Sequence, residues 1–345
     1  MNMDREKFGT EELGICLSHY DLSAIKSIKE FARGSRRAPK IVLDSKRGKF
    51  LFKRRAVGKD NVRKVAFAHQ IQLYLAAQNF PLPHLIGTRQ NNNSMLIKDN
   101  LIYEMFEYVP GTTYDGAADT TYSAGHILGL FHKLMRDFKS EYTAPTGSYH
   151  DAKAIHQAMA NAVASLPKET LPPAETLTEV VSSLEAAYQS CAKQANDLGL
   201  AEWELQIVHG DWHPGNMLFR DRQVMAVIDY DSARLQQRVI DIANGSLQFS
   251  IIGGAEDPSK WPDNLDEARF KHFLAGYDSV NVISKAEIRT IPFLMCEAMI
   301  AEAVLPIAAT GSFGQFEGFP FLQMIDRKVK WILAHAEQLQ SAMES

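Results

Sequence analysis

Three oxygen-bearing side chains, Asp211, Asn216 and Asp229, lie in one short polar segment of the chain. The segment follows an apolar strand-like run and contains two further runs, residues 217–219 and 224–228, on either side of a polar turn. Folding this hairpin about its turn places Asn216 opposite Asp229 at the open end, with Asp211 on the loop just before it. We therefore expect the three side chains to converge.

The converging oxygens suit a magnesium ion that is bound together with phosphate groups. Mg²⁺ prefers carboxylate and amide oxygens and usually shares its ligands with a phosphate substrate, so Asn216 and Asp229 are the expected metal ligands. A separate carboxylate must face the attacking hydroxyl, and Asp211 is expected in that catalytic role. The pattern predicts phosphoryl transfer.

The spacing of these residues also resembles that of a known family. His209, Asp211 and Asn216 follow the H-x-D-x-x-x-x-N order of kinase catalytic loops, and Asp229 begins a D-Y-D triplet where protein kinases have D-F-G. The form HGDWHPGN followed by IDYD resembles more closely the aminoglycoside phosphotransferase and choline kinase-like family. This resemblance implies a two-lobed protein-kinase-like fold, ATP or GTP with Mg²⁺ as cofactors, and phosphorylation of a hydroxyl on a small molecule.

Two residues are expected to support the catalytic loop rather than to react. His209, which stands ahead of the loop, is expected to brace it. Asp241 resembles the structural aspartate of the family, which implies that it holds the loop by accepting hydrogen bonds from backbone N–H groups.

Lys53 is the expected nucleotide-binding cation. In a strand over residues 49–53 its side chain points away from that of Phe52. A lysine in an apolar strand needs a counter-charge, because burying an unpaired ammonium costs much free energy. ATP phosphates would supply that charge, and the position resembles the family's nucleotide-binding lysine. Arg54 or Arg55 takes the role if the register differs by one residue.

Kinase-like folds normally offer this lysine a glutamate from the following helix. The helix predicted over residues 61–78 contains none. His69 or Gln70 could take its place, or the lysine could rely on phosphate alone.

Two further stretches are expected to contact the nucleotide. The small, basic loop of residues 32–38, with Ser35 at its centre, would cover the phosphates. The strand that ends near Pro110 resembles the hinge of kinase-like folds, which implies that the Glu107 carbonyl and the Val109 N–H bind adenine with Phe106 behind the ring.

The acceptor is not defined by the sequence. Asp231, Glu297 and Glu302 could meet a cationic acceptor, and Trp212 could narrow the acceptor pocket. Aminoglycoside, choline-like, homoserine-like and sugar acceptors all fit the same catalytic loop, because acceptor choice depends on the variable helices.

Two other functions remain open. His209, Asp211 and His213 form an H-x-D-x-H pattern that suits a zinc- or manganese-dependent hydrolase, with Asp229 as a further ligand. That interpretation gives Asn216 no purpose. The absent helix glutamate also keeps open a catalytically silent, kinase-like binding protein.

Composition narrows the class of partner and the compartment. The net charge of −4 gives no basic excess, so nucleic acid is not an expected partner. The three cysteines are scattered and the first residues are not apolar, which predicts a cytoplasmic protein. The apolar run of residues 299–309 is too short to cross a bilayer, so no membrane association is expected. The oligomeric state is not predicted.

The hydrophobic pattern predicts strands in the first third of the chain and mostly helices after it. With the resemblance, this implies an α+β protein with a small antiparallel-sheet N-lobe over residues 1–106 and a larger, mostly helical C-lobe over residues 107–345. Strands are predicted over residues 24–31, 40–44, 49–53, 94–98 and 101–108, and helices over residues 4–20, 61–78, 243–250, 266–277, 285–309 and 321–339, with others between residues 121 and 198.

Overall fold

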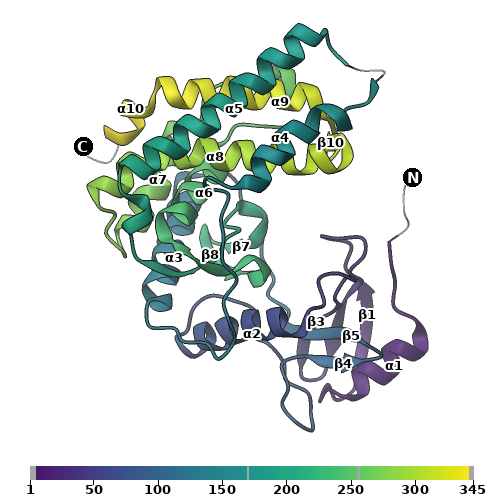
Figure 1. Ribbon diagram of the computed structural model, residues 1–345. Helices are drawn as coiled ribbons and strands as arrows, with labels where there is room; N and C mark the ends of the chain where they lie inside the picture. The colour runs from purple at the N-terminus through teal and green to yellow at the C-terminus, as the bar shows by residue number, and fades with distance from the viewer. Residues whose placement is uncertain (1–4, 169–170, 255–256, 342–345) are drawn as a thin grey trace.

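The computed structural model describes residues 5–168, 171–254 and 257–341. Figure 1 shows two parts, a small N-terminal sheet with one short helix and a larger body of helices. The predicted α+β class with an antiparallel N-terminal sheet is confirmed. The lobe boundary near residue 106 stays a prediction, and the last strand of the sheet, β5 (Leu101–Glu107), ends there.

The N-terminal sheet has five antiparallel strands in the order β1-β2-β3-β5-β4. Their bounds are β1 Ile25–Glu30, β2 Lys40–Ser45, β3 Gly48–Arg54 and β4 Leu96–Lys98. Side chains alternate across the sheet, so Phe50 and Phe52 pack into a small core beside helix α1 (Thr10–Ser18). Leu51 and Lys53 face the opposite side, as the sequence predicted for Lys53.

Helix α2 (Val62–Ala77) lies between the sheet and the helical body (Figure 1). Its Phe67 and Ile71 side chains belong to the main core, which is otherwise built by the C-terminal helices. The Tyr74 hydroxyl donates to the Leu134 carbonyl at 3.1 Å. The helix is therefore attached to the helical body although it lies in the predicted N-lobe.

The helical body is organised around α8, which packs against α4, α5, α6 and α9 (Figure 1). The bounds are α3 Ala118–Met135, α4 Lys153–Ser165, α5 Ala174–Asp197, α6 Arg238–Ser250, α7 Glu267–Asp278, α8 Lys285–Thr310, α9 Gly318–Ala334 and α10 Ala336–Ser341. Helix α6 begins before the predicted start at residue 243, because residues 239–243 are all buried and show no helical period. Residues 310–318, which lie between the predicted helices over residues 285–309 and 321–339, contain the short hairpin β10 (Ser312–Phe313) and β11 (Phe316–Glu317).

Helices α3 and α7 approach each other at glycines. A Cβ atom at Gly125 of α3 would overlap the Phe273 carbonyl oxygen, and one at Gly276 of α7 would overlap the Tyr122 carbonyl oxygen. The two backbones can therefore pack this closely only because both positions are glycine.

Within the described residues, α8 alone is long and apolar enough to cross a membrane. The part of the helix that meets this test is 78% buried inside the protein. A buried core helix of this kind is weak evidence for a membrane span.

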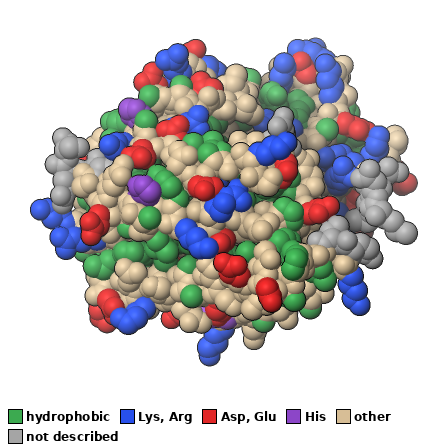
Figure 2. Space-filling view, turned by 90° about the horizontal axis from the view of Figure 1, so that it is seen from above, with side chains coloured by type: hydrophobic (Ala, Val, Ile, Leu, Met, Phe, Trp, Pro, Cys, Tyr) green, Lys and Arg blue, Asp and Glu red, His purple; other side chains and the backbone are tan. Residues whose placement is uncertain are grey.

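The surface around the helices carries both signs of charge. Figure 2 shows Lys and Arg side chains mixed with Asp and Glu over most of the visible face. This mixture agrees with the small net charge of the chain.

Two short sheets hold the polar segment identified above. Strand β6 (Leu205–Val208) pairs with β9 (Arg234–Gln237), and β7 (Met217–Arg220) pairs with β8 (Gln223–Val227). The catalytic loop connects β6 to β7.

Candidate active site

The catalytic loop is fixed at its start by Asp241. This carboxylate accepts hydrogen bonds from the His209 N–H at 2.9 Å and the Gly210 N–H at 3.0 Å. The His132 ring nitrogen lies 3.2 Å from the same carboxylate. Gly210 has a positive φ of 74°, and a Cβ there would meet the Ser232 carbonyl oxygen. This is the bonding that the sequence predicted for Asp241.

His209 and Trp212 are both fully buried beneath the loop. Their rings pack edge to face with centroids 5.2 Å apart, and His209 also lies against Tyr230. Burial lowers the pKa of His209. His209 thus braces the loop through packing and through its backbone. The expectation that Trp212 narrows the acceptor pocket is wrong, because the indole is enclosed by the core.

Asp211 and Asn216 are joined directly. The Asn216 Nδ2 donates to the Asp211 backbone carbonyl at 3.0 Å and to the Asp211 Oδ2 at 2.9 Å. The His213 Nε2 lies 3.7 Å from the Asp211 Oδ1. Burial opposes ionisation of Asp211, but His213, His209 and Asn216 together outweigh it and lower the pKa of the carboxyl. The Asp211 carboxylate is therefore charged at neutral pH.

The hairpin register differs from the predicted one. Met217 pairs with Val227, and the Ile228 N–H donates to the Asn216 carbonyl at 2.9 Å. Asn216 therefore lies opposite Ile228 rather than Asp229, because the hairpin closes on the Arg220–Gln223 pair and the irregularity between Leu218 and Phe219 shifts the pairing toward Asp229 by only one residue. Asp229 follows immediately with φ of 65°.

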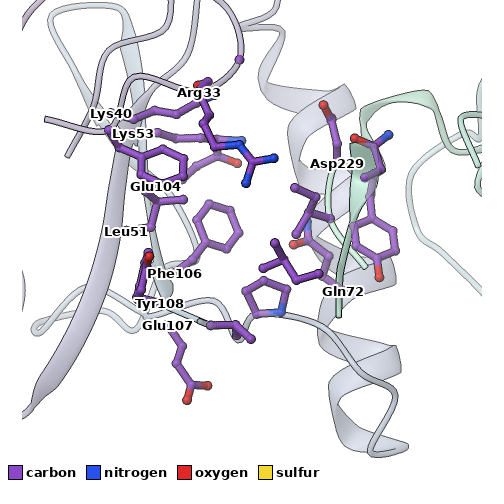
Figure 3. A pocket seen from close by; sticks show the side chains of 18 of the residues that line it. Arg33, Lys40, Leu51, Lys53, Gln72, Glu104, Phe106, Glu107, Tyr108 and Asp229 are labelled. Carbon is purple, nitrogen blue, oxygen red and sulfur yellow. Dashed lines mark hydrogen bonds and ion pairs between the residues drawn. The ribbon is translucent and has the colours of Figure 1, made fainter. Parts of the chain in front are cut away.

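A cavity of about 400 Å³ lies between the sheet and the helical body. Asn216 and Asp229 both line it from the helical side. Figure 3 shows Lys53 and Phe106 on the sheet side of this cavity, facing Asp229. The structure thus brings together the predicted metal ligands and the predicted nucleotide lysine.

The partner of Lys53 is a glutamate that the sequence did not reveal. Glu104 of β5 is the cross-strand neighbour of Lys53, and its Oε2 lies 3.0 Å from the Lys53 Nζ. His69 of α2 contacts the Glu104 Oε1 at 2.6 Å. Burial would raise the pKa of Glu104, but Lys53, His69 and Arg55 together lower it strongly. The missing helix glutamate is therefore replaced from the neighbouring strand, with His69 joined to it.

Arg55 connects the two parts of the molecule. Its guanidinium donates to Glu104 at 2.8 Å and to both carboxylate oxygens of Asp231 at 2.8 Å each. Asp231 lines the same cavity as Asp229. Asp231 was expected to contact a cationic acceptor. This expectation is wrong, because Arg55 binds both of its carboxylate oxygens. Arg54 points to the opposite face and pairs with Glu12 at 2.6 Å.

The predicted hinge borders the other end of the cavity. Phe106, Glu107 and Val109 line it. The Glu107 N–H donates to the His84 carbonyl at 2.8 Å, whereas the Tyr108 N–H donates to β3. Alternate residues of a strand direct their polar backbone groups to opposite edges, so the N–H and C=O of Glu107 point away from β3. The adenine contacts of Glu107 and Val109 stay a prediction.

The loop of residues 32–38 lines the cavity, but not through Ser35, the residue expected to do so. Arg33 and Gly34 line the cavity. The Ser35 hydroxyl instead accepts a hydrogen bond from the Arg37 N–H at 3.2 Å. Ser35 is not among the residues that line the described cavity, so its predicted nucleotide contact is wrong, because its hydroxyl closes the local turn.

The two glutamates of α8 have different surroundings. Glu297 is fully buried and bound to the His150 Nδ1 at 2.9 Å, so its expected acceptor contact is wrong. Glu302 is reached by solvent and accepts from the Gln248 Nε2 at 2.5 Å. The surrounding protein and the nearby Asp211 carboxylate raise the pKa of Glu302 to about 7. Glu302 thus stays a candidate acceptor residue.

The H-x-D-x-H residues do not form a metal cluster. His209 is enclosed in the core, whereas His213 lies on the exposed side of Asp211. Within residues 5–168, 171–254 and 257–341, no three His, Cys, Asp or Glu side chains are placed to hold a metal ion together. The hydrolase alternative is therefore not supported by this geometry.

A sequence profile of the phosphotransferase enzyme family, APH, matches residues 27–282, which is more than half of the chain. The chain belongs to the phosphotransferase enzyme family. The predicted family and the predicted phosphotransferase class are thereby confirmed. No curated protein matches the sequence.

Solved structures of this phosphotransferase family's kinase-like fold resemble the chain over nearly its full length. An aminoglycoside phosphotransferase from Alicyclobacillus acidocaldarius has 16% identity and a TM-score of 0.69, covering 95% of this chain and 96% of its own. A microcompartment-associated aminopropanol kinase has 12% identity and a TM-score of 0.70, covering 96% and 99%. A choline kinase from Cryptosporidium parvum has 17% identity and a TM-score of 0.62, covering 96% of each chain. The predicted kinase-like fold is confirmed.

The sequence analysis missed Glu104 and Lys40, and it gave Arg55 only an alternative role. Glu104 stands alone among apolar residues in the segment LIYEMFE. A carboxylate buried in such a strand requires cationic partners, and this was the signal available. Lys40, which also lines the cavity, gave no such signal because it stands at the start of its strand.

Proposed function

We propose that this phosphotransferase moves the γ-phosphoryl group of ATP, or of GTP, to a hydroxyl group of a small molecule. The observation that carries the proposal is the Asp211–Asn216 contact beside the cavity. It joins the carboxylate that would orient the hydroxyl to an amide that lines the cavity with Asp229. The ion pair of Lys53 with Glu104 supports nucleotide binding on the facing wall.

The residues present fit a divalent metal ion such as Mg²⁺. The Asn216 Nδ2 is committed to Asp211, which leaves the amide oxygen available as a ligand. Asp229 lines the same cavity and forms no ion pair with the described residues. Together these give the amide and carboxylate oxygens that Mg²⁺ prefers, and a bound ion would neutralise phosphate charge.

Asp211 would act by position and charge. Its lowered pKa keeps it ionised, so it can accept a hydrogen bond from the acceptor hydroxyl and direct the oxygen at the γ-phosphorus. As the new O–P bond forms and the bond to the bridging oxygen breaks, the hydroxyl proton passes to Asp211 and ADP leaves. Lys53 would hold the remaining phosphates.

The acceptor is proposed to carry a positive charge as well as a hydroxyl. Glu302 lies close enough to Asp211 for the two carboxylates to repel each other. An ammonium group near Glu302 would relieve this repulsion and favour the ionised form of Glu302. This observation favours amine-bearing acceptors over uncharged sugars.

The silent-binding alternative loses its main support. It rested on the missing glutamate of the helix, and Glu104 now supplies that charge to Lys53.

The proposal is tested by measuring ADP release with a panel of hydroxylated amines, aminoglycosides and uncharged sugars. We expect ADP release with at least one amine-bearing acceptor and its loss when Mg²⁺ is chelated. Absence of acceptor-dependent ADP release across the panel, in protein shown to be folded, would count against the proposed function.

A further inference from the structure

Two lysines stand side by side on the sheet wall of the cavity. Lys40 of β2 and Lys53 of β3 are direct cross-strand partners, and both line the cavity. Opposite positions on an antiparallel pair have Cβ atoms about 5 Å apart, and like charges there are destabilising. Figure 3 shows both side chains extending from this wall toward the space that faces Asp229. A pair of this kind is useful if an anion binds against it.

The two lysines differ in how their charge is balanced. Lys53 has Glu104 at 3.0 Å. The Lys40 Nζ donates to the Arg33 carbonyl at 3.2 Å, and no carboxylate of the described ranges forms an ion pair with it. Burial, with repulsion from Lys53, lowers the pKa of Lys40. Lys40 thus has no ion-pair partner among the described residues, although Asp229 offsets part of its charge.

The loop over the cavity rests on the Lys40 ammonium. Gly34 has φ of 78°, and a Cβ at this position would lie 2.6 Å from the Lys40 Nζ. From outside, Arg5 donates to the Ala32 carbonyl at 2.6 Å and to the Ser35 carbonyl at 3.0 Å. The loop is therefore held on its outer side by Arg5, and its inner contact is Lys40.

We propose that Lys40 is a second phosphate-binding residue, which exchanges the Arg33 carbonyl for a phosphate oxygen of the nucleotide. This inference rests on the proposed function and adds a residue to it. A phosphate oxygen is a stronger acceptor for an ammonium than a neutral carbonyl, because the hydrogen bond is charge-assisted on both sides. Lys53, which is already paired with Glu104, and Lys40, which has no ion-pair partner among the described residues, would then both bind the phosphates.

The test compares the affinities of adenosine, AMP, ADP and Mg-ATP, measured by calorimetric titration. The proteins are the natural chain, Lys40→Met, Lys40→Arg and the control Lys49→Met. Lys49 is exposed at the start of β3 and lies outside the residues that line the cavity. We expect Lys40→Met to weaken Mg-ATP and ADP binding about ten-fold or more and to leave adenosine binding unchanged. Lys40→Arg should retain most of the affinity, and Lys49→Met all of it.

A purely structural role for Lys40 gives a different result. If Lys40 acts only by holding the loop over the phosphates, Arg5→Met, which removes the loop's outer hydrogen bonds, weakens Mg-ATP as much as Lys40→Met does, and the inference is overturned. Unchanged Mg-ATP affinity in Lys40→Met also overturns it, while leaving the proposed function intact. If the natural chain binds no nucleotide, the proposed function fails and this inference fails with it.

Melting temperatures without nucleotide check that each variant is folded. Because Lys40 faces Lys53 without a carboxylate of its own, Lys40→Met should melt no lower than the natural chain.

Discussion

Asp211 and Asn216 share one contact, so the proposed catalytic carboxylate and one proposed metal ligand are positioned together. The Asn216 amide cannot turn over without losing its bonds to the Asp211 carbonyl and carboxylate. A substitution that breaks these hydrogen bonds should therefore disturb both roles, whereas Asp211→Asn keeps an oxygen that can accept from the Asn216 amide.

At the residue scale, Asp211→Asn is expected to lower kcat about 100-fold or more, because the amide cannot accept the hydroxyl proton. Mg-ATP affinity should change little. The matched control is Asp221→Asn in the exposed turn of the same hairpin, where φ is 49° and asparagine is well tolerated. Acceptor-dependent ADP release and nucleotide titration give the two readouts. Equal activity of both variants would remove Asp211 from the mechanism.

Glu302 predicts a pH dependence of acceptor binding. Its pKa of about 7 means that it is mostly neutral below this pH and charged above it. The KM for an amine-bearing acceptor should therefore fall as the pH rises through about 7. His213 and Asp211 face the same region, and the pKa of His213 is raised by Asp211, so His213 also titrates. The Glu302→Gln variant separates the effects of Glu302 and His213. The pH dependence of KM that this variant loses is due to Glu302, and the part that it keeps is due to His213.

At the residue scale, the sequence correctly predicted the roles of side chains that depend on residues nearby in the chain. Asp241 was identified from its resemblance to the structural aspartate of the family, and Lys53 from the alternation of side chains within its own strand. Glu104 was missed because its partners come from β3 and α2, and pairing between distant strands is not visible in one sequence. Trp212 was misplaced because sequence spacing does not show which face of a loop turns into the core.

At the scale of elements, Glu104 holds β3, β5 and α2 together through Lys53, Arg55 and His69. Glu104→Gln is expected to destabilise the protein by about 3–5 kcal/mol, because it leaves buried cations without their charge partner. Urea unfolding measures this loss. Glu30→Gln on the edge strand β1 is the control, since Glu30 and its partner Lys7 are exposed and should matter by about 0.5 kcal/mol at most. Similar losses for the two variants would contradict the central role of Glu104.

The contact between α3 and α7 gives a second prediction for elements. Gly125→Ala should destabilise the protein by about 1–3 kcal/mol, because the new methyl group overlaps the Phe273 carbonyl. Gly14→Ala in α1 meets no atom within 4 Å and should stabilise its helix by about 0.5–1 kcal/mol. Thermal melts of the two variants should therefore move in opposite directions. A Gly125→Ala protein as stable as the natural chain would show that the helices can separate at low cost.

At the scale of the whole molecule, alternation and helical period predicted the class and most elements correctly. Strands β2 and β3 were predictable because their side chains alternate between the small core and the opposite face. The start of α6 was not, because a helix buried on all sides has no polar face to mark its period. The predicted hairpin register was wrong because the residue types do not mark the pair on which the hairpin closes, which is Arg220 with Gln223.

The attachment of α2 to the helical body affects how the protein could be divided. A fragment of residues 1–106 made alone would expose Phe67 and Ile71, which are buried against the C-terminal helices in the intact chain. Such a piece is expected to aggregate. A division between Arg54 and Val62 is no better, because β4 and β5 follow α2 in the chain and Tyr103 and Met105 of β5 complete the core of the sheet. The sheet and the helical body are therefore expected to be produced only as one chain.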